Sequence, residues 1–131
     1  MTKKKILIVD DEIEMVEVET LRLKASGYEI LAAHDGQSGL KTARQCLPDL
    51  VILDIMLPLM DGYQVCEALK NDAKCREIPI ILMSAVDRKY DTDLGRKAGA
   101  DAYFTKPFEP PLLLEKIKEL LRNRKSATPP A

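Results

Sequence analysis

Several patterns that would assign the chain to a membrane, secreted or disulfide-rich class are missing from its sequence. No apolar run approaches the roughly 20 residues that cross a bilayer, and Ile6–Val9 is too short for the apolar region of a signal peptide. The three cysteines are an odd number and show no C-x-x-C spacing, so we expect free thiols in a reducing compartment. These absences predict a cytoplasmic protein without membrane association.

Binding motifs for nucleotides, zinc and nucleic acids are absent as well. The sequence contains neither G-x-x-x-x-G-K-[ST] nor G-x-G-x-x-G, so no phosphate-binding loop for a nucleotide is expected. There is no cluster of His and Cys that would suit Zn²⁺, and the single histidine, His34, is expected on the surface. The net charge of -1 and the lack of a basic stripe argue against direct nucleic-acid binding.

What the sequence does contain is a regular alternation of short apolar runs with helical patterns. The 131 residues are 46% hydrophobic and 31% charged, which suits one soluble globular domain. The runs are rich in Ile, Val and Leu and are typical of strands covered on both faces. Strands are predicted at 5–9, 29–33, 50–53, 78–83 and 102–105, and helices at 13–26, 37–47, 63–72, 88–98 and 109–123.

This order predicts an α/β domain in which a strand and a helix alternate five times. Such (βα)5 chains form a doubly wound parallel sheet, and the flavodoxin-like strand order 2-1-3-4-5 is the usual solution at this size. We expect the domain over residues 1–123 and a tail or the start of a linker over 124–131. Met15, Val18 and Leu21 are predicted to form the buried face of the first helix. Apolar neighbours likewise suggest that Cys46 and Cys66 pack in the core.

Polar residues stand at the carboxyl ends of four predicted strands, where ligands bind in sheets of this kind. They are Asp10-Asp11-Glu12 after the first strand, Asp54 after the third, Ser84 after the fourth and Lys106 after the fifth. Taken singly, Asp11 is better explained as a helix cap, Ser84 as a turn residue and Lys106 as a surface charge. Asp54 differs, because it lies between apolar residues and a buried aspartate needs a partner.

Together these groups predict a phosphoryl-transfer site. Two unit charges 4 Å apart repel by about 4 kcal/mol at an effective dielectric constant of 20, so aspartates gathered at one edge need compensation. The Lys106 ammonium and a hard cation such as Mg²⁺ would supply it, since Mg²⁺ takes one or two carboxylates and keeps its waters. A carboxylate beside both can attack phosphorus, while Ser84 donates to a phosphoryl oxygen.

At this point the sequence closely resembles the receiver domain of bacterial two-component response regulators, over roughly residues 4–123. The resemblance is carried by four segments in order, each at a strand end. They are Ile-Val-Asp10-Asp11-Glu12, Leu-Asp54-Ile-Met-Leu-Pro58-Leu-Met-Asp61-Gly62-Tyr, Ser84-Ala85, and Gly99-Ala-Asp-Ala-Tyr103-Phe-Thr-Lys106-Pro107-Phe108.

The resemblance implies a role for each matching residue. Asp54 is expected to be the phospho-acceptor, forming a 4-aspartylphosphate, with Lys106 in contact with the phosphoryl group. Magnesium, or Mn²⁺ in its place, would bind Asp11, Asp54 and the backbone carbonyl of Met56, and would reach Asp10 through water. Ser84 and Tyr103 would be the switch residues, and the Lys106–Pro107 bond would be cis.

The resemblance also implies a signalling switch, not an enzyme acting on other substrates. A sensor histidine kinase or a phosphotransfer protein would donate the phosphoryl group. The surface formed by 88–98, 102–105 and 109–123 would then change to control an output domain or a downstream protein, with a phosphorylation-dependent dimer as one form of output. Apolar Met56 and Val86 favour a long-lived phosphorylated state. The sequence departs from the family at Leu59, where glycine is common.

Two other classes fit the sequence less well. A haloacid-dehalogenase-like phosphatase also uses an Asp nucleophile and Mg²⁺, but it has D-x-D after the first strand and a cap domain, whereas here the acidic pair is adjacent. A flavodoxin-like cofactor binder would need a Ser/Thr/Gly-rich loop after the first strand, where Asp10-Asp11-Glu12 repels phosphate. The cognate kinase and stimulus, the output, the oligomeric state and the phosphoryl lifetime are not encoded in any pattern that we find.

Overall fold

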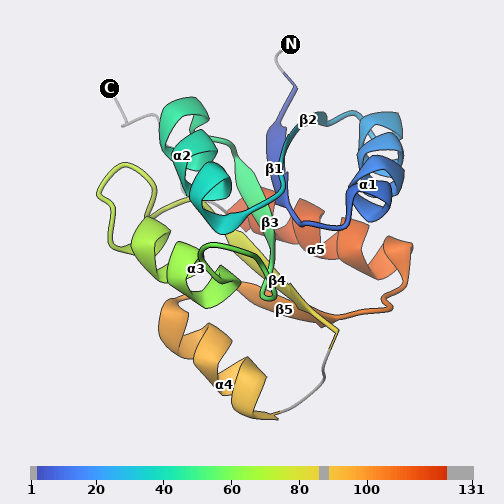
Figure 1. Cartoon of the computed structure of the whole chain (residues 1–131). Coiled ribbons are helices and arrows are strands. Elements are labelled where there is room, and N and C mark those ends of the chain that lie inside the picture. Colours follow the sequence, from blue (N-terminus) through green and yellow to red (C-terminus); the bar gives the residue numbers. More distant parts are fainter. Residues whose placement is uncertain (1–2, 86–88, 124–131) are drawn as a thin grey trace.

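The computed structural model describes residues 3–85 and 89–123, without the side chains of 89–92. Strands and helices alternate along the whole of this part of the chain (Figure 1). The strands are β1 (Lys5–Val9), β2 (Glu29–Ala33), β3 (Leu50–Asp54), β4 (Ile80–Ser84) and β5 (Ala102–Thr105). The helices are α1 (Ile13–Ala25), α2 (Gly36–Cys46), α3 (Gly62–Lys70), α4 (Lys89–Ala98) and α5 (Pro110–Asn123).

The strands form one parallel sheet in the order β2-β1-β3-β4-β5. This confirms the predicted fold and strand order. The boundary errors reach two residues, at the end of α3, which was expected at 63–72, and at the start of β4, which was expected at 78–83 and runs from Ile80 to Ser84. Pro79 has no N–H to give to the ladder, so the strand begins after it. Val86 and the predicted tail at 124–131 lie outside the described residues.

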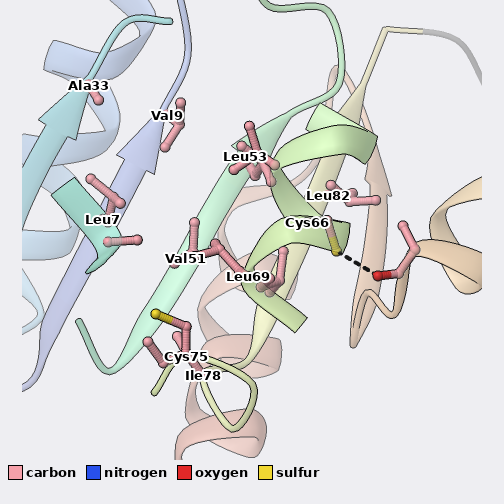
Figure 2. Close-up of a cluster of buried hydrophobic side chains, with 14 of the residues drawn as sticks. Leu7, Val9, Ala33, Val51, Leu53, Cys66, Leu69, Cys75, Ile78 and Leu82 are labelled. Carbon is pink, nitrogen blue, oxygen red and sulfur yellow. Dashed lines mark hydrogen bonds between the residues drawn. The ribbon is translucent and has the colours of Figure 1, made fainter. Parts of the chain in front are cut away.

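Helices cover both faces of the sheet and create two apolar cores. On one face, α2, α3 and α4 bury Ala43, Val65, Leu69 and Ala98 against the strands. Figure 2 shows part of this core, including Leu69 of α3. On the other face, α1 and α5 pack Val16, Leu23, Leu113 and Ile117 against the strands. Successive residues of β1, β3 and β4 point to opposite faces and are buried on both, as their unbroken apolar runs predict.

Two predictions about buried side chains are wrong. Helix α1 buries Val16 and Leu23, while Val18 and Leu21 of the predicted face are exposed. Cys46 is exposed, because α2 ends there and the following Leu47 turns the chain away with a left-handed φ of 47°. Cys66 is buried as predicted, and its Sγ lies 3.5 Å from the carbonyl oxygen of Ala98 on α4 (Figure 2).

Helix α3 begins directly beyond the end of β3, at the edge of the sheet where the polar residues gather. Its N-terminus has a capping box, in which Asp61 Oδ1 accepts from the Gln64 N–H at 2.9 Å and Gln64 Oε1 accepts from the Asp61 N–H at 3.0 Å. The next residue, Gly62, lies against the main chain of β3, and a Cβ there would be 2.7 Å from the Cα of Ile55. The start of α3 is therefore pressed against the backbone that carries Asp54.

Candidate functional site

The predicted site residues lie at the carboxyl edge of the sheet because each follows or ends a parallel strand. Asp10 comes immediately after β1, Asp54 is the last residue of β3 and Ser84 is the last residue of β4. Lys106 follows β5 and donates its backbone N–H to the Ser84 carbonyl oxygen at 2.7 Å. Strands β1 and β3 are neighbours in the sheet, so Asp10 and Asp54 stand side by side.

The ammonium of Lys106 joins three carboxylates at this edge. Its Nζ lies 2.8 Å from Asp10 Oδ2, 3.0 Å from Asp54 Oδ2 and 3.4 Å from Glu12 Oε1. The side chains of Lys106, Asp10 and Asp54 are 10%, 8% and 7% exposed, whereas that of Glu12 is 60% exposed. Lys106 therefore forms a buried ion triad with the two aspartates, and Glu12 contacts it from the solvent side.

Each buried aspartate divides its two oxygens between Lys106 and the backbone. Asp10 Oδ1 accepts from the Glu12 N–H at 2.9 Å, and Asp54 Oδ1 accepts from the Met56 N–H at 3.1 Å. Hydrogen bonds of this kind favour the ionised carboxylate and fix its orientation. The turns after β1 and β3 thus hold both carboxylates facing the same ammonium.

The electrostatics of the site leave an excess of negative charge. Burial raises the pKa of the Asp54 carboxyl above its usual range, the Asp10 charge adds to this effect, and the hydrogen bond and charge of Lys106 oppose it. Burial alone would lower the pKa of Lys106, but Asp10 and Asp54 together outweigh it and raise that pKa, so the amine stays protonated. Because one ammonium faces three carboxylates, a bound cation would offset the remaining negative charge.

The donor set at this edge fits a hard divalent cation. Asp10, Glu12 and Asp54 each offer a carboxylate oxygen, and these oxygens all lie within 4.8 Å of one another. Oxygen ligands of this kind suit Mg²⁺, and the sulfur and imidazole ligands that Zn²⁺ favours are absent from the group. Asp11 is exposed beside this group and is not part of it, although the resemblance implied that Asp11 is a direct ligand.

The other expected residues surround the same edge. Ser84 is buried next to Asp54, since β4 pairs with β3 in a register that sets Asp54 against Met83. Met56 supplies its N–H to Asp54, and its side chain is exposed. Tyr103 on β5 is partly buried against the core that lies under α4. The Lys106–Pro107 bond is cis, as the resemblance implied.

Two contacts at the site were not predicted. Glu12 reaches Lys106, and the only sequence signal for this was its place as the third acidic residue in a row. His34 is exposed as expected, yet its Nδ1 lies 3.0 Å from the carbonyl oxygen of Asp10. Nothing in the sequence around His34 indicated that contact, because it depends on how the chain leaves β2.

The strand order and the carboxylate–ammonium cluster at the carboxyl edge define a flavodoxin-like α/β domain with an acidic cation site. The family model for the "Response regulator receiver domain" matches residues 6–118. The chain belongs to this family, and it is therefore a receiver domain, a signalling domain of two-component systems. The family is neither that of the haloacid-dehalogenase-like phosphatases nor that of the flavodoxin-like cofactor binders.

Two curated relatives are transcriptional regulators that are longer than this chain. The alkaline phosphatase synthesis transcriptional regulatory protein PhoP of Bacillus subtilis (strain 168) is 42% identical over 126 residues, which are 96% of this chain and 52% of that protein. The DNA-binding dual master transcriptional regulator RpaA of Synechocystis sp. is 38% identical over 118 residues, covering 90% and 49%. The chain thus spans about half the length of these relatives.

Solved structures show the same fold. The CheY-like response regulator receiver domain protein of Methanospirillum hungatei JF-1 has a TM-score of 0.88 at 32% identity, covering 94% of this chain and 97% of that one. The receiver domain of sensor histidine kinase PA1611 of Pseudomonas aeruginosa PAO1 has a TM-score of 0.86 at 25% identity, covering 93% and 100%. That structure holds a magnesium ion in its active-site cleft.

No helix within residues 3–85 and 89–123 is both long and apolar enough to cross a membrane.

Proposed function

We propose that this domain takes a phosphoryl group onto Asp54 from a phosphohistidine, with Mg²⁺ bound at the acidic edge and Mn²⁺ able to replace it. The observation that carries the proposal is the convergence of Lys106 Nζ on Asp54 at 3.0 Å and on Asp10 at 2.8 Å, in a pocket whose carboxylates also suit a divalent cation. Asp54 is the carboxylate at the centre of this arrangement, because β3 is the middle strand of the sheet.

In this mechanism a carboxylate oxygen of Asp54 forms a bond to phosphorus while the N–P bond of the phosphohistidine breaks, which leaves an acyl phosphate on Asp54. When bound, Mg²⁺ would neutralise charge on the phosphoryl oxygens. Asp11, Asp54 and the Met56 carbonyl would hold the ion, with Asp10 linked through water, and the nearby Glu12 carboxylate would add to the negative charge around it. The Met56 N–H keeps Asp54 oriented for attack.

Lys106 and Ser84 would stabilise the product. The Lys106 ammonium already lies within hydrogen-bonding distance of Asp54, so a phosphoryl oxygen attached there falls within its reach. Ser84 ends the neighbouring strand β4, and its hydroxyl would donate to another phosphoryl oxygen. Both groups gain an interaction that exists only after phosphorylation, which is what biases a two-state element.

The output would be a change on the surface formed by α4, β5 and α5. Tyr103 lies on β5, where it pairs with Leu82 of β4, two residues before Ser84. Movement of Ser84 toward the phosphoryl group would let Tyr103 turn inward and alter that surface. Because PhoP and RpaA are transcriptional regulators of about twice this length, the expected partners are a sensor histidine kinase or phosphotransfer protein on one side and an output domain or downstream protein on the other.

The domain itself would not contact nucleic acid, because its net charge is -1. A dimer that forms on phosphorylation is one way in which the changed surface would act. A cytoplasmic location is consistent with three free cysteines.

Incubation with Mg²⁺ and acetyl phosphate, followed by intact mass measurement, tests the proposal. We expect one added phosphoryl group, which is lost on hydroxylamine treatment and is absent when the metal is chelated. Asp54→Asn should stay unlabelled, while Asp93→Asn on α4, a matched aspartate change away from the site, should be labelled like the native protein. Equal labelling of Asp54→Asn would refute the assignment.

A further inference from the structure

We infer that His34 is a positioning residue that holds the acidic turn Asp10–Glu12 in place through the main chain of Asp10. The imidazole Nδ1 lies 3.0 Å from the Asp10 carbonyl oxygen, although the two residues are 24 positions apart in sequence. His34 is the residue directly after β2, and Asp10 is the residue directly after β1. The contact therefore joins the ends of two neighbouring strands at the site.

The position of this contact follows from the parallel ladder. The register of β1 and β2 ends with Val9 opposite Ala33, and the Asp10 N–H still donates to the Ala33 carbonyl oxygen at 3.1 Å. In a parallel pair the carbonyl of the same residue would next accept from a backbone N–H further along the neighbouring strand. Here β2 has ended, and the side chain of His34 reaches the Asp10 carbonyl. Both backbone polar groups of Asp10 are thus held from the β2 side.

The held carbonyl belongs to the peptide group that joins Asp10 to Asp11. A peptide group is planar, so a hydrogen bond to its oxygen restrains the direction in which Asp11 leaves. The Asp10 carboxylate is already fixed by Lys106 and by the Glu12 N–H. The carboxylate of Asp11, in contrast, is exposed, and the main chain is what places it. His34 would therefore preorganise the exposed part of the acidic turn for a cation without adding charge to it.

The contact also fixes which imidazole nitrogen carries hydrogen. A carbonyl oxygen only accepts, so Nδ1 must be the protonated nitrogen, in the neutral ring and in the cation alike. The interaction is therefore maintained in both charge states. It has a spectroscopic signature that can be assigned without ambiguity, because His34 is the only histidine in the chain.

Long-range ¹H–¹⁵N spectra of the neutral imidazole in the metal-free protein test the contact itself. We expect a pyrrole-type shift at Nδ1 and a pyridine-type shift at Nε2. Free imidazole side chains favour the opposite tautomer, so a protonated Nε2 as the main form would overturn the inference. This measurement requires neither Mg²⁺ nor phosphorylation, and it stands apart from the proposed function.

The consequence for the acidic turn rests on the proposed function and is tested by calorimetric titration with Mg²⁺ alone. His34→Ala should bind Mg²⁺ about three- to tenfold more weakly, the range that loss of one solvent-accessible hydrogen bond gives. His34→Asn should restore affinity, since its amide nitrogen stands at the same side-chain position as Nδ1. Gln37→Ala, an exposed neighbour on α2, should leave the affinity unchanged.

The outcomes of the titration separate the two claims. Equal affinity of His34→Ala and the native protein would overturn the positioning role while leaving the proposed function intact. Failure of His34→Asn to recover affinity would overturn it as well, because a donor at that position is what the inference requires. If the native protein itself does not bind Mg²⁺, the proposed function fails and the consequence drawn here for metal binding fails with it.

Discussion

At the scale of single residues, Lys106 compensates the negative charge of the carboxylates at the carboxyl edge of the folded sheet. Its ammonium is shared by Asp10 and Asp54, both almost fully buried, and it has a weaker contact with Glu12. Removing the Lys106 ammonium would leave two buried carboxylates without compensation, whereas Lys106 keeps Asp10 as a partner if Asp54 is neutralised. Asp11 is in a different position, because among the described residues no ion pair or hydrogen bond engages its exposed carboxylate. A carboxylate without a protein partner is the one most available to a cation.

This contrast predicts unequal effects of two neighbouring substitutions. Asp11→Asn should weaken Mg²⁺ binding by at least about tenfold, since it removes a carboxylate that is free to coordinate the ion. Glu12→Gln should weaken it less, because the Glu12 carboxylate already contacts Lys106 and is mostly in solvent. Calorimetric titration of both variants measures the two affinities under the same conditions.

The two substitutions are at adjacent positions and each replaces a carboxylate by an amide, so each variant is a control for the other. A larger loss of Mg²⁺ affinity in Glu12→Gln than in Asp11→Asn would contradict this prediction. It would mean that the ion contacts the group formed by Asp10, Glu12 and Asp54 directly, and not Asp11.

Leu59 is a second residue whose conformation bears on the site. The sequence departs there from a position where the family often has glycine, and the structure gives Leu59 a left-handed φ of 70°. A residue with a Cβ is disfavoured in that region by roughly 1–2 kcal/mol. The turn between β3 and α3 therefore has, at Leu59, a backbone conformation that glycine adopts without strain.

At the scale of elements, the start of α3 lies directly against the main chain of Asp54, the proposed phospho-acceptor. Gly62 lies so close to β3 that a Cβ would contact the Asp54 carbonyl oxygen and stand 2.7 Å from the Cα of Ile55. Both of those contacts are with main chain, which cannot rotate away as a flexible side chain could. Any side chain at this position must therefore move the end of β3 or the helix.

Gly62→Ala should accordingly reduce both stability and phosphorylation. We expect a loss of about 1–3 kcal/mol in the free energy of unfolding, as for other overpacked positions, and a slower rate of labelling by acetyl phosphate. Urea denaturation and time-resolved intact mass measure the two quantities.

Asp61→Ala provides the matched control for Gly62→Ala. It removes the side-chain half of the capping box and should cost about 1 kcal/mol without forcing a new atom against Asp54. Its labelling rate should stay close to that of the native protein. An unchanged rate in Gly62→Ala would show that the contact between α3 and β3 does not position the acceptor.

Elements are also the level at which the sequence was most informative. Unbroken apolar runs in β1, β3 and β4 could be recognised because both faces of a central strand are buried. The buried face of α1 could not, since Val16 and Leu23 are two turns apart and fit the helical period as well as the stripe that includes Val18 and Leu21. Only docking against the sheet distinguishes those two faces.

The candidate site divides along the same line. Asp10, Asp54, Ser84 and Lys106 could be predicted to converge, because residues at the carboxyl ends of parallel strands share one edge of the sheet. The contacts made by Glu12 and His34 could not be predicted, because they depend on the turns that follow β1 and β2.

At the scale of the whole molecule, the site places charge at one end of a sheet whose two cores are otherwise apolar. The stability of the domain is therefore linked to the charge state of Asp54. Burial raises the pKa of this carboxyl in the folded protein, so the folded state holds its proton more tightly than the unfolded state does. As the pH rises above the ordinary value of 3.8, the charged Asp54 increasingly lowers stability, and this effect levels off once the pH exceeds the folded-state pKa.

Asp54→Asn removes that burden and should be more stable than the native protein without metal at neutral pH. The gain in melting temperature should shrink toward acidic pH, where the unfolded chain also carries a protonated Asp54. Adding Mg²⁺ should raise the melting temperature of the native protein, since a ligand that binds only the folded state stabilises it, and should raise that of Asp54→Asn less.

Thermal melts at several pH values, with and without Mg²⁺, measure all of these differences. A variant that melts below the native protein in metal-free buffer at neutral pH would mean that the contact with Lys106 outweighs the burial of the Asp54 charge.

The central claim, that Asp54 is the residue that receives the phosphoryl group, has one most direct measurement. Treating the protein with acetyl phosphate and Mg²⁺ and then with borohydride reduces an aspartyl phosphate to homoserine, and peptide mass spectrometry locates the converted residue. The account predicts homoserine at position 54, dependent on Mg²⁺ and absent when acetyl phosphate is omitted. Conversion at another aspartate or glutamate, with residue 54 unchanged, would contradict it.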